Sequence, residues 1–169
     1  MDNGFKSLKG QLLLDSGNLA GSFFMRTVVL VCEHTAEGAL GLVLNRQSKN
    51  TVGEMILADL PEQVNEQELF VGGPVQEGAL SYLHSDDFLP DANVLPNLSL
   101  SHSLEELAVL GDSYSKTHQI RVFAGYSTNG ATRRRSTARW RRTKTSRQLC
   151  LRKPRGYVRP RAKARHGAM

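Results

Sequence analysis

Cys32 and His34 stand two residues apart and are the first pair in the chain that could do acid–base or nucleophilic chemistry. On a strand, residues two apart face the same side, so the thiol and the imidazole would be neighbours. An imidazole beside a thiol favours the thiolate, the nucleophilic and redox-active form. The sequence identifies neither a third catalytic residue nor an oxyanion hole. We therefore favour a structural role, with Cys32 buried on a strand and His34 in a hairpin.

Two further segments have residue types that can bind an anion. Asn45 and Arg46 follow an apolar run, where an amide and a guanidinium can hold a carboxylate or phosphate, although Asn there is equally a turn former. Gly72, Gly73 and Pro74 can present backbone N–H groups to an anion. That segment lacks the Lys and the Ser/Thr of a phosphate-binding loop, so we favour a tight turn between strands.

A metal site is weakly indicated by His84, Asp86 and Asp87, which lie close together in the sequence. Short His/Asp clusters are common in loops, and no other ligand converges on this one. We expect a surface loop there and predict neither a metal nor a cofactor.

The C-terminal part of the chain has the residue types of a polyanion-binding segment. Arginines flank a single tryptophan there, as in basic stretches that bind RNA by phosphate contact and base stacking. The candidate nucleic-acid contacts are Arg133, Arg134, Arg135, Trp140, Arg141 and Arg142.

Charge divides the 169-residue chain sharply. The net charge of +6 hides an acidic part, residues 1–127, with seven Lys or Arg, 16 Asp or Glu and a net charge of −9. Residues 128–169 hold 15 Lys or Arg and no acid. We therefore expect no specific nucleic-acid binding from residues 1–127, and any such binding must come from the basic segment.

The pattern of apolar residues in residues 1–127 predicts strands and short helices. Capping boxes at Thr51–Glu54 and Ser103–Glu106 start the helices, which Pro61 and Gly111 are expected to end. Strands joined by hairpins with inserted helices indicate an α+β domain. The predicted strands are residues 26–32 and 38–44 as a hairpin, 66–71 with 78–84 as its antiparallel partner, 94–101 interrupted by Pro96, and 119–124.

Several sequence blocks resemble the bacterial AlgH/YqgE family. They agree in order and spacing over roughly residues 5–127, which makes the resemblance specific. The blocks are Val31-Cys-Glu-His34, Glu37-Gly-Ala-Leu-Gly-Leu-Val-Leu-Asn-Arg46, Gly72-Gly-Pro-Val75 and Arg121-Val-Phe-Ala-Gly-Tyr126. The opening Leu8–Leu14 and the segment Phe23-Phe-Met-Arg-Thr27 also match.

The resemblance implies a single α+β domain around a mostly antiparallel, branched and barrel-like sheet with flanking helices. Members of this family have a poorly defined biochemical role, and some carry labels as transcriptional or translational regulators. The resemblance ends at Ser127, after which the family continues with an acidic helix and a final apolar strand and helix.

Residues 128–169 depart from both the family pattern and any secondary-structure period. They contain twelve arginines and scattered apolar side chains, so the segment cannot bury enough apolar area to order on its own. When a GC-rich gene is translated in the wrong reading frame, the sequence changes abruptly to an Arg-rich segment without acidic residues. We predict an out-of-frame terminus; the alternative is a genuine basic tail, and sequencing across the Ser127 codon distinguishes them.

The sequence indicates the function of the protein less directly than its fold. Without a complete catalytic constellation we favour a non-enzymatic, cytoplasmic regulator that acts through a protein partner, with no signal peptide and no membrane span. One alternative is a small anionic-ligand-binding protein or enzyme that uses Cys32, His34, Asn45 and Arg46. The other is a nucleic-acid-binding regulator that uses the basic tail.

Overall fold

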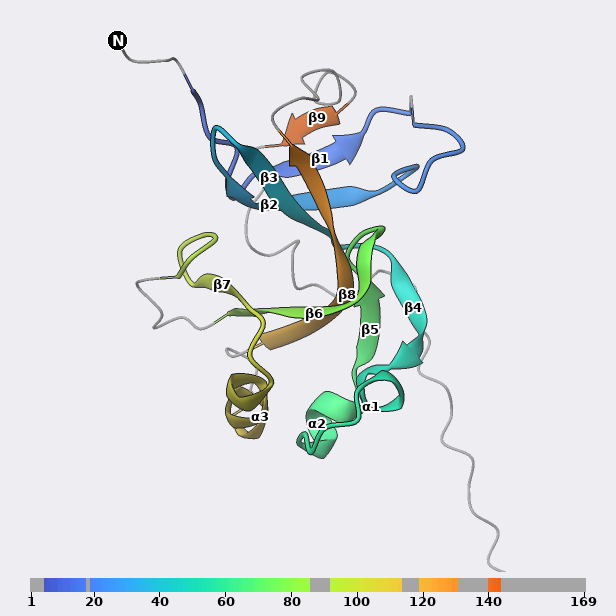
Figure 1. Cartoon of the computed structure of the whole chain (residues 1–169), viewed down its shortest axis with the longest axis vertical. Coiled ribbons are helices and arrows are strands. Elements are labelled where there is room, and N and C mark those ends of the chain that lie inside the picture. The colour runs from blue at the N-terminus through green and yellow to red at the C-terminus, as the bar shows by residue number, and fades with distance from the viewer. Residues whose placement is uncertain (1–4, 18, 86–91, 114–118, 131–139, 144–169) are drawn as a thin grey trace, which may run out of the picture.

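One branched sheet organises the fold. The structure is a computed structural model that describes residues 5–17, 19–85, 92–113, 119–130 and 140–143. Its sheet follows the path β4-β5-β8-β3-β2-β1-β9, with β6 pairing with β8 and with β7 off this path (Figure 1). The strands are β1 (Leu12–Asp15), β2 (Val28–His34), β3 (Gly38–Val43), β4 (Gln47–Thr51), β5 (Glu68–Val71), β6 (Val75–Ser85), β7 (Leu98–Ser101), β8 (Gln119–Gly130) and β9 (Trp140–Thr143).

Strand β8 is the branch point. Its first half pairs in parallel with β5 on one side and antiparallel with β6 on the other, and its end pairs antiparallel with β3. Gly125, in the left-handed region with φ 69°, lies where the partners change. The predicted α+β domain with a mostly antiparallel, branched sheet is confirmed. Among the described strands, β4 and β9 end the path, so the sheet is not closed into a barrel.

The predicted hairpin is present as β2 and β3. Five of the seven residues in β2 are apolar and four of these are buried, as expected for a strand rich in β-branched residues. The register shifts between Val31 and Glu33, which marks a β-bulge at Cys32.

The first helix is shorter than the pattern predicts, and the helix ends also differ from the prediction. The capping box of Thr51 and Glu54 is present, but α1 (Val52–Met55) is one turn, because Ile56 adopts an extended conformation. Pro61 does not end a helix; it is the N-cap of α2 (Glu62–Asn65), where its fixed φ suits a helix start. In α3 (Leu104–Asp112), Gly111 lies inside the helix and not at its end.

The strand predictions also need correction. Residues 78–84 form part of β6, which pairs with β7 and β8, so the predicted pairing with β5 is wrong. The polar strand β4 was not predicted, and neither was the continuation of β8 to Gly130 nor β9, which pairs with β1. Two short parts of the basic segment therefore lie in strands, although its sequence has no strand period.

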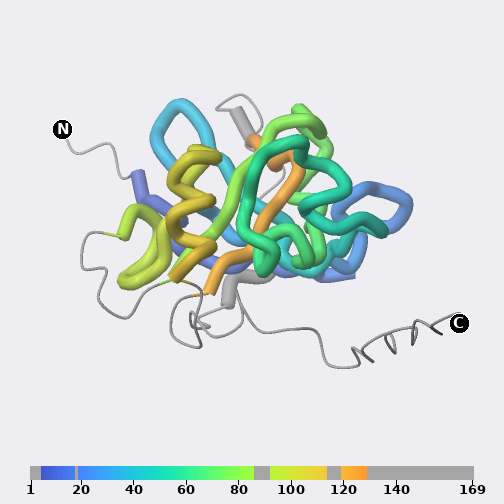
Figure 2. The backbone as a smooth tube through the Cα atoms, turned by 90° about the horizontal axis from the view of Figure 1, so that it is seen from below, coloured from blue at the N-terminus to red at the C-terminus, as the bar shows by residue number. Residues whose placement is uncertain are grey.

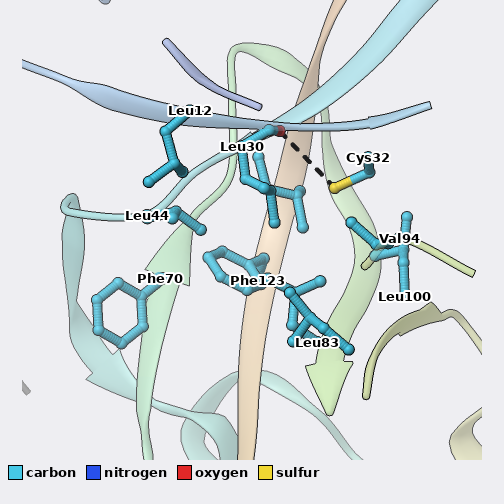
Figure 3. Packing of buried hydrophobic residues seen from close by; sticks show 11 residues of the cluster. Leu12, Leu30, Cys32, Leu44, Phe70, Leu83, Val94, Leu100 and Phe123 are labelled. Atoms are coloured by element: carbon cyan, nitrogen blue, oxygen red, sulfur yellow. Dashed lines mark hydrogen bonds between the residues drawn. The ribbon is translucent and has the colours of Figure 1, made fainter. Parts of the chain in front are cut away.

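Buried apolar side chains form two clusters. The first lies between strands β1–β3 and strands β5–β8 (Figure 3). It contains Leu12, Leu30, Cys32, Leu42, Leu44, Phe70, Leu83, Val94, Leu98, Leu100 and Phe123. The second packs the helices against β5, β6 and β8 and contains Val52, Leu60, Val64, Leu69, Tyr82, Leu107, Ile120 and Val122.

All three helices lie at one end of the sheet, and β1, β2, β3 and β9 lie at the other (Figure 1). Viewed from below, the tubes of α1, α2 and α3 lie beside one another on the near side (Figure 2). Within the described residues, none of the helices is long and apolar enough to cross a membrane.

Candidate functional site

Cys32 is a core residue. Its side chain is 0% exposed, and its thiol donates a weak hydrogen bond to the Leu30 carbonyl oxygen at 3.7 Å inside the first apolar cluster (Figure 3). A nucleophile must meet its substrate, and a thiol buried among leucine, valine and phenylalanine side chains does not. The geometry matches the structural role favoured from the sequence.

His34 holds the N-terminal segment against the end of β2. Its Nδ1 accepts a hydrogen bond from the Leu8 N–H at 2.7 Å, and its ring packs against Phe5 with a centroid distance of 4.9 Å. The Ser7 hydroxyl donates to the His34 carbonyl at 3.1 Å. An accepting Nδ1 places the imidazole proton on Nε2. The imidazole therefore has a defined structural contact.

Asn45 fixes the connection between β1 and β2. Its Nδ2 donates to the Arg26 carbonyl at 2.9 Å, and its Oδ1 accepts from the Val28 N–H at 2.9 Å. Arg26 has a φ of 57°, an unfavourable conformation for a non-glycine residue, and its N–H donates to the Asp15 carboxylate at 2.9 Å. Asn45 thus satisfies backbone groups on both sides of a strained residue.

We expect Asn45→Ala to lower the free energy of unfolding by about 1–3 kcal/mol, because two hydrogen bonds are lost at a strained turn. Urea denaturation of the full chain measures this. The control is Asn50→Ala, since the Asn50 amide donates to the Met55 sulfur at 3.1 Å on the surface, and we expect a change within about 0.5 kcal/mol. Equal losses in the two variants would contradict the role given to Asn45.

Arg46 holds the same connection from its other side. Its guanidinium carbon lies 4.2 Å from the centre of the Phe23 ring, and its Nη2 donates to the Phe23 carbonyl at 2.7 Å. Its own carbonyl accepts from the Val71 N–H at 2.8 Å. The half-buried side chain therefore combines a cation–π contact with a hydrogen bond to the backbone.

The glycines at 72 and 73 let two stretches of backbone pack closely. The Gly72 N–H donates to the Ala124 carbonyl at 2.8 Å, and the Gly72 carbonyl accepts from the Val43 N–H at 2.8 Å. A Cβ at Gly73 would overlap the carbonyl group of Tyr126. Both glycines are buried and Pro74 is exposed. The segment is the tight turn between β5 and β6 that the sequence favoured.

The remaining candidates fall in different places. His84 is 4% exposed within β6, so its expected position in a surface loop is wrong, while Asp86 and Asp87 lie outside the described residues. Within the described part of the chain, no group of three or more His, Cys, Asp or Glu side chains is placed to hold a metal ion. Of the basic candidates, the backbone of residues 140–142 lies in β9, and residues 133–135 lie outside the described residues.

A family model described as AlgH-like, DUF179, matches residues 12–155. The chain belongs to the AlgH-like family. The match extends past Ser127, where the resemblance seen in the sequence ended. The out-of-frame origin of residues 128–169 stays a prediction that sequencing the gene tests.

Relatives agree with the AlgH-like assignment, and two solved structures are similar in fold. A UPF0301 protein of Chlorobaculum parvum is 40% identical over 131 residues, covering 75% of this chain and 68% of the relative. A UPF0301 protein of Beijerinckia indica is 35% identical over 134 residues, covering 71% and 65%. The solution structure of AlgH from Pseudomonas aeruginosa is similar in fold, with a TM-score of 0.68 and 24% identity over 89% of this chain and 85% of that one. A protein of Corynebacterium diphtheriae solved by crystallography gives a TM-score of 0.67 and 18% identity over 86% and 80%.

Sequence reasoning missed one polar cluster of this AlgH-like domain, which joins β6, β7 and α3. The Tyr82 hydroxyl lies 2.9 Å from Glu106 Oε2 and 3.1 Å from the Ser103 carbonyl, and the Ser101 hydroxyl also donates to Glu106. These donors hold the pKa of Glu106 below its ordinary value, with Ser101 as the larger cause. The sequence signal was the Ser103–Glu106 cap, whose Ser103 Oγ accepts from the Glu106 N–H at 3.2 Å.

The same cluster predicts a pH-dependent loss of stability in alkali. Burial raises the pKa of Tyr82 to about 12, and the Glu106 carboxylate acts in the same direction. The folded chain therefore binds the phenolic proton more tightly than the unfolded chain does. This contribution to stability is complete below pH 10 and is lost as the pH rises toward about 12.

We expect the difference in unfolding free energy between the native chain and Tyr82→Phe to shrink over that pH range, because the variant has no phenol at this position. Urea denaturation at several pH values between 9 and 12 measures it. The tyrosine at 126 supplies the control variant, Tyr126→Phe. A constant difference between the native chain and Tyr82→Phe would contradict the assignment.

Proposed function

We propose that this AlgH-like chain is a non-catalytic regulator that acts by binding a protein partner. The observation that carries the proposal is that its chemically capable side chains are occupied in holding the fold together. Cys32 is inside the core, His34 fixes the N-terminal segment, and Asn45 holds a strained turn. Groups occupied in holding the fold are poor candidates for catalysis or ligand exchange.

The exposed surface supports a protein partner. The described part of the chain exposes six large hydrophobic side chains, and such side chains commonly contribute to protein interfaces. They are Phe5, Met25, Met55, Leu57, Leu104 and Val109. The net charge of −9 over residues 1–127 disfavours a polyanion as the partner of this part of the chain.

Site-specific photo-crosslinking of the full chain in its native host tests the proposal. A photoreactive phenylalanine analogue replaces Met25, Leu57 or Val109 in turn, and the exposed Gly78 serves as the control position. We expect at least one of the three positions to give a discrete crosslinked protein several-fold above the yield from position 78. Crosslinks to nucleic acid alone, or protein yields no higher than those from position 78, would overturn the proposal.

A further inference from the structure

The end of the domain that carries the helices has an unbalanced charge. We call residues 52–67 and 103–113 the helical end, since they contain α1, α2 and α3. The helical end has no Lys or Arg, and all of its acidic side chains are exposed. These acidic residues are Glu54, Asp59, Glu62, Glu66, Glu105, Glu106 and Asp112. With no basic side chain among them, these carboxylates give the helical end a net negative charge, which attracts cationic groups.

The helical end also carries most of the exposed apolar side chains. Of the six large hydrophobic residues exposed in the described part of the chain, four belong to it. Leu57 is 103% exposed and Val109 is 71% exposed, and Met55 and Leu104 are the other two. Apolar side chains among acidic ones suit an occupant that combines positive charge with some apolar residues.

The chain itself contains a segment of that composition. Residues 144–169 hold nine Lys or Arg and no acid. Leu149, Leu151, Tyr157 and Val158 supply apolar side chains among those bases. The segment lies outside the described residues, and its composition is what enters the inference.

We infer that residues 144–169 dock on the helical end of the same chain, held by charge attraction with apolar contacts added. Strand β9 ends at Thr143 beside β1, at the end of the sheet away from the helices (Figure 1). The 26 residues after it can extend to about 85 Å, whereas a domain of this size is roughly 35 Å across.

The inference goes beyond the proposed function and does not depend on it. It rests on the charge of the segment, whether or not the segment is translated from the original reading frame. If it holds, a partner that approaches the helical end must displace the tail, whereas a partner at Phe5 or Met25 need not.

Paramagnetic relaxation in the full chain tests the docking. Cys32 is 0% exposed, so a thiol-reactive spin label placed through Cys150→Ser and Ala164→Cys reports the tail alone. At about 0.01 M salt we expect the backbone amides of the helical end to relax faster than those of the β2–β3 turn. At about 1 M salt, where the Debye length falls from about 30 Å to 3 Å, we expect this difference to disappear.

Two charge variants in the labelled chain separate docking from general attraction. Glu62→Gln, Glu66→Gln and Glu105→Gln together are expected to lower the relaxation enhancement at the helical end at least about threefold. The matched control, Glu33→Gln, Glu37→Gln and Glu77→Gln, removes the same charge from exposed positions outside the helical end and is expected to leave it unchanged.

Three results would overturn the inference. One is an enhancement spread evenly over both ends of the domain, and another is an enhancement at the helical end that does not change with salt. The third is an enhancement seen when the spin-labelled chain is mixed with a separate isotope-labelled chain, which would place the tail on a second copy. Failure of any of these tests leaves the crosslinking test of a protein partner unaffected.

Discussion

Replacing Gly73 with alanine is expected to lower the free energy of unfolding by about 3 kcal/mol or more, or to prevent folding. A Cβ at this position would overlap the Tyr126 carbonyl and come within 2.5 Å of the Ser127 nitrogen. These are backbone atoms of β8, the strand on which the sheet branches, so they cannot move aside without breaking its pairing with β6. Urea denaturation followed by circular dichroism gives the measurement.

Gly78→Ala is the matched control, since Gly78 is exposed in β6 and an added Cβ would meet no atom within 4 Å. We expect its stability to stay within about 0.5 kcal/mol of the native chain. If the two glycine variants were equally stable, the close packing of the turn against β8 would be contradicted.

Phe123→Ala is expected to cost about 3–5 kcal/mol, because it leaves a cavity at the centre of the first apolar cluster. Phe123 is 0% exposed, and its ring centre lies 5.8 Å from that of Phe70 on the neighbouring parallel strand (Figure 3). The same denaturation experiment measures the loss.

Phe5→Ala serves for comparison, since Phe5 is 49% exposed and packs against His34 at the edge of the fold. We expect a loss below about 1 kcal/mol. A similar loss in the two variants would mean that Phe123 is not at the centre of the core.

Local patterns were sufficient for part of this fold. The dense β-branched run of β2 and the apolar run of β3 predicted a hairpin that is present, and the capping residues Thr51 and Ser103 marked two helix starts correctly. These signals depend on neighbours a few residues away, so they can be recognised in the sequence alone.

The pairing of distant strands could not be predicted in this way. Strand β5 pairs in parallel with β8, about fifty residues later, and no local signal distinguishes this from pairing with the next strand. Strand β4, Gln47–Thr51, has no apolar alternation because it is a largely exposed edge strand. Its position depends on backbone pairing with β5, which its side chains do not reveal.

The contacts of the candidate site residues also could not be predicted from local sequence patterns. The sequence placed Asn45 and Arg46 together at a strand end, and the structure agrees. They contact the Phe23–Val28 segment, about twenty residues earlier in the chain, whose turn includes the strained Arg26. The Tyr82–Glu106 contact joins a strand to a helix, and the capping pattern showed only its local half.

We propose that Asn45 and Arg46 hold the fold through their contacts with the backbone of residues 23–28 and bind no anion. Thermal unfolding of the full chain with millimolar phosphate, sulfate, nucleotides and small carboxylates tests it most directly, with Arg46→Ala as the paired variant. We predict no rise in Tm above about 2 °C for any of these anions in the native chain, and a lower Tm for Arg46→Ala without them. A larger rise in the native chain that Arg46→Ala abolishes would contradict the claim and establish an anion site at the end of β3.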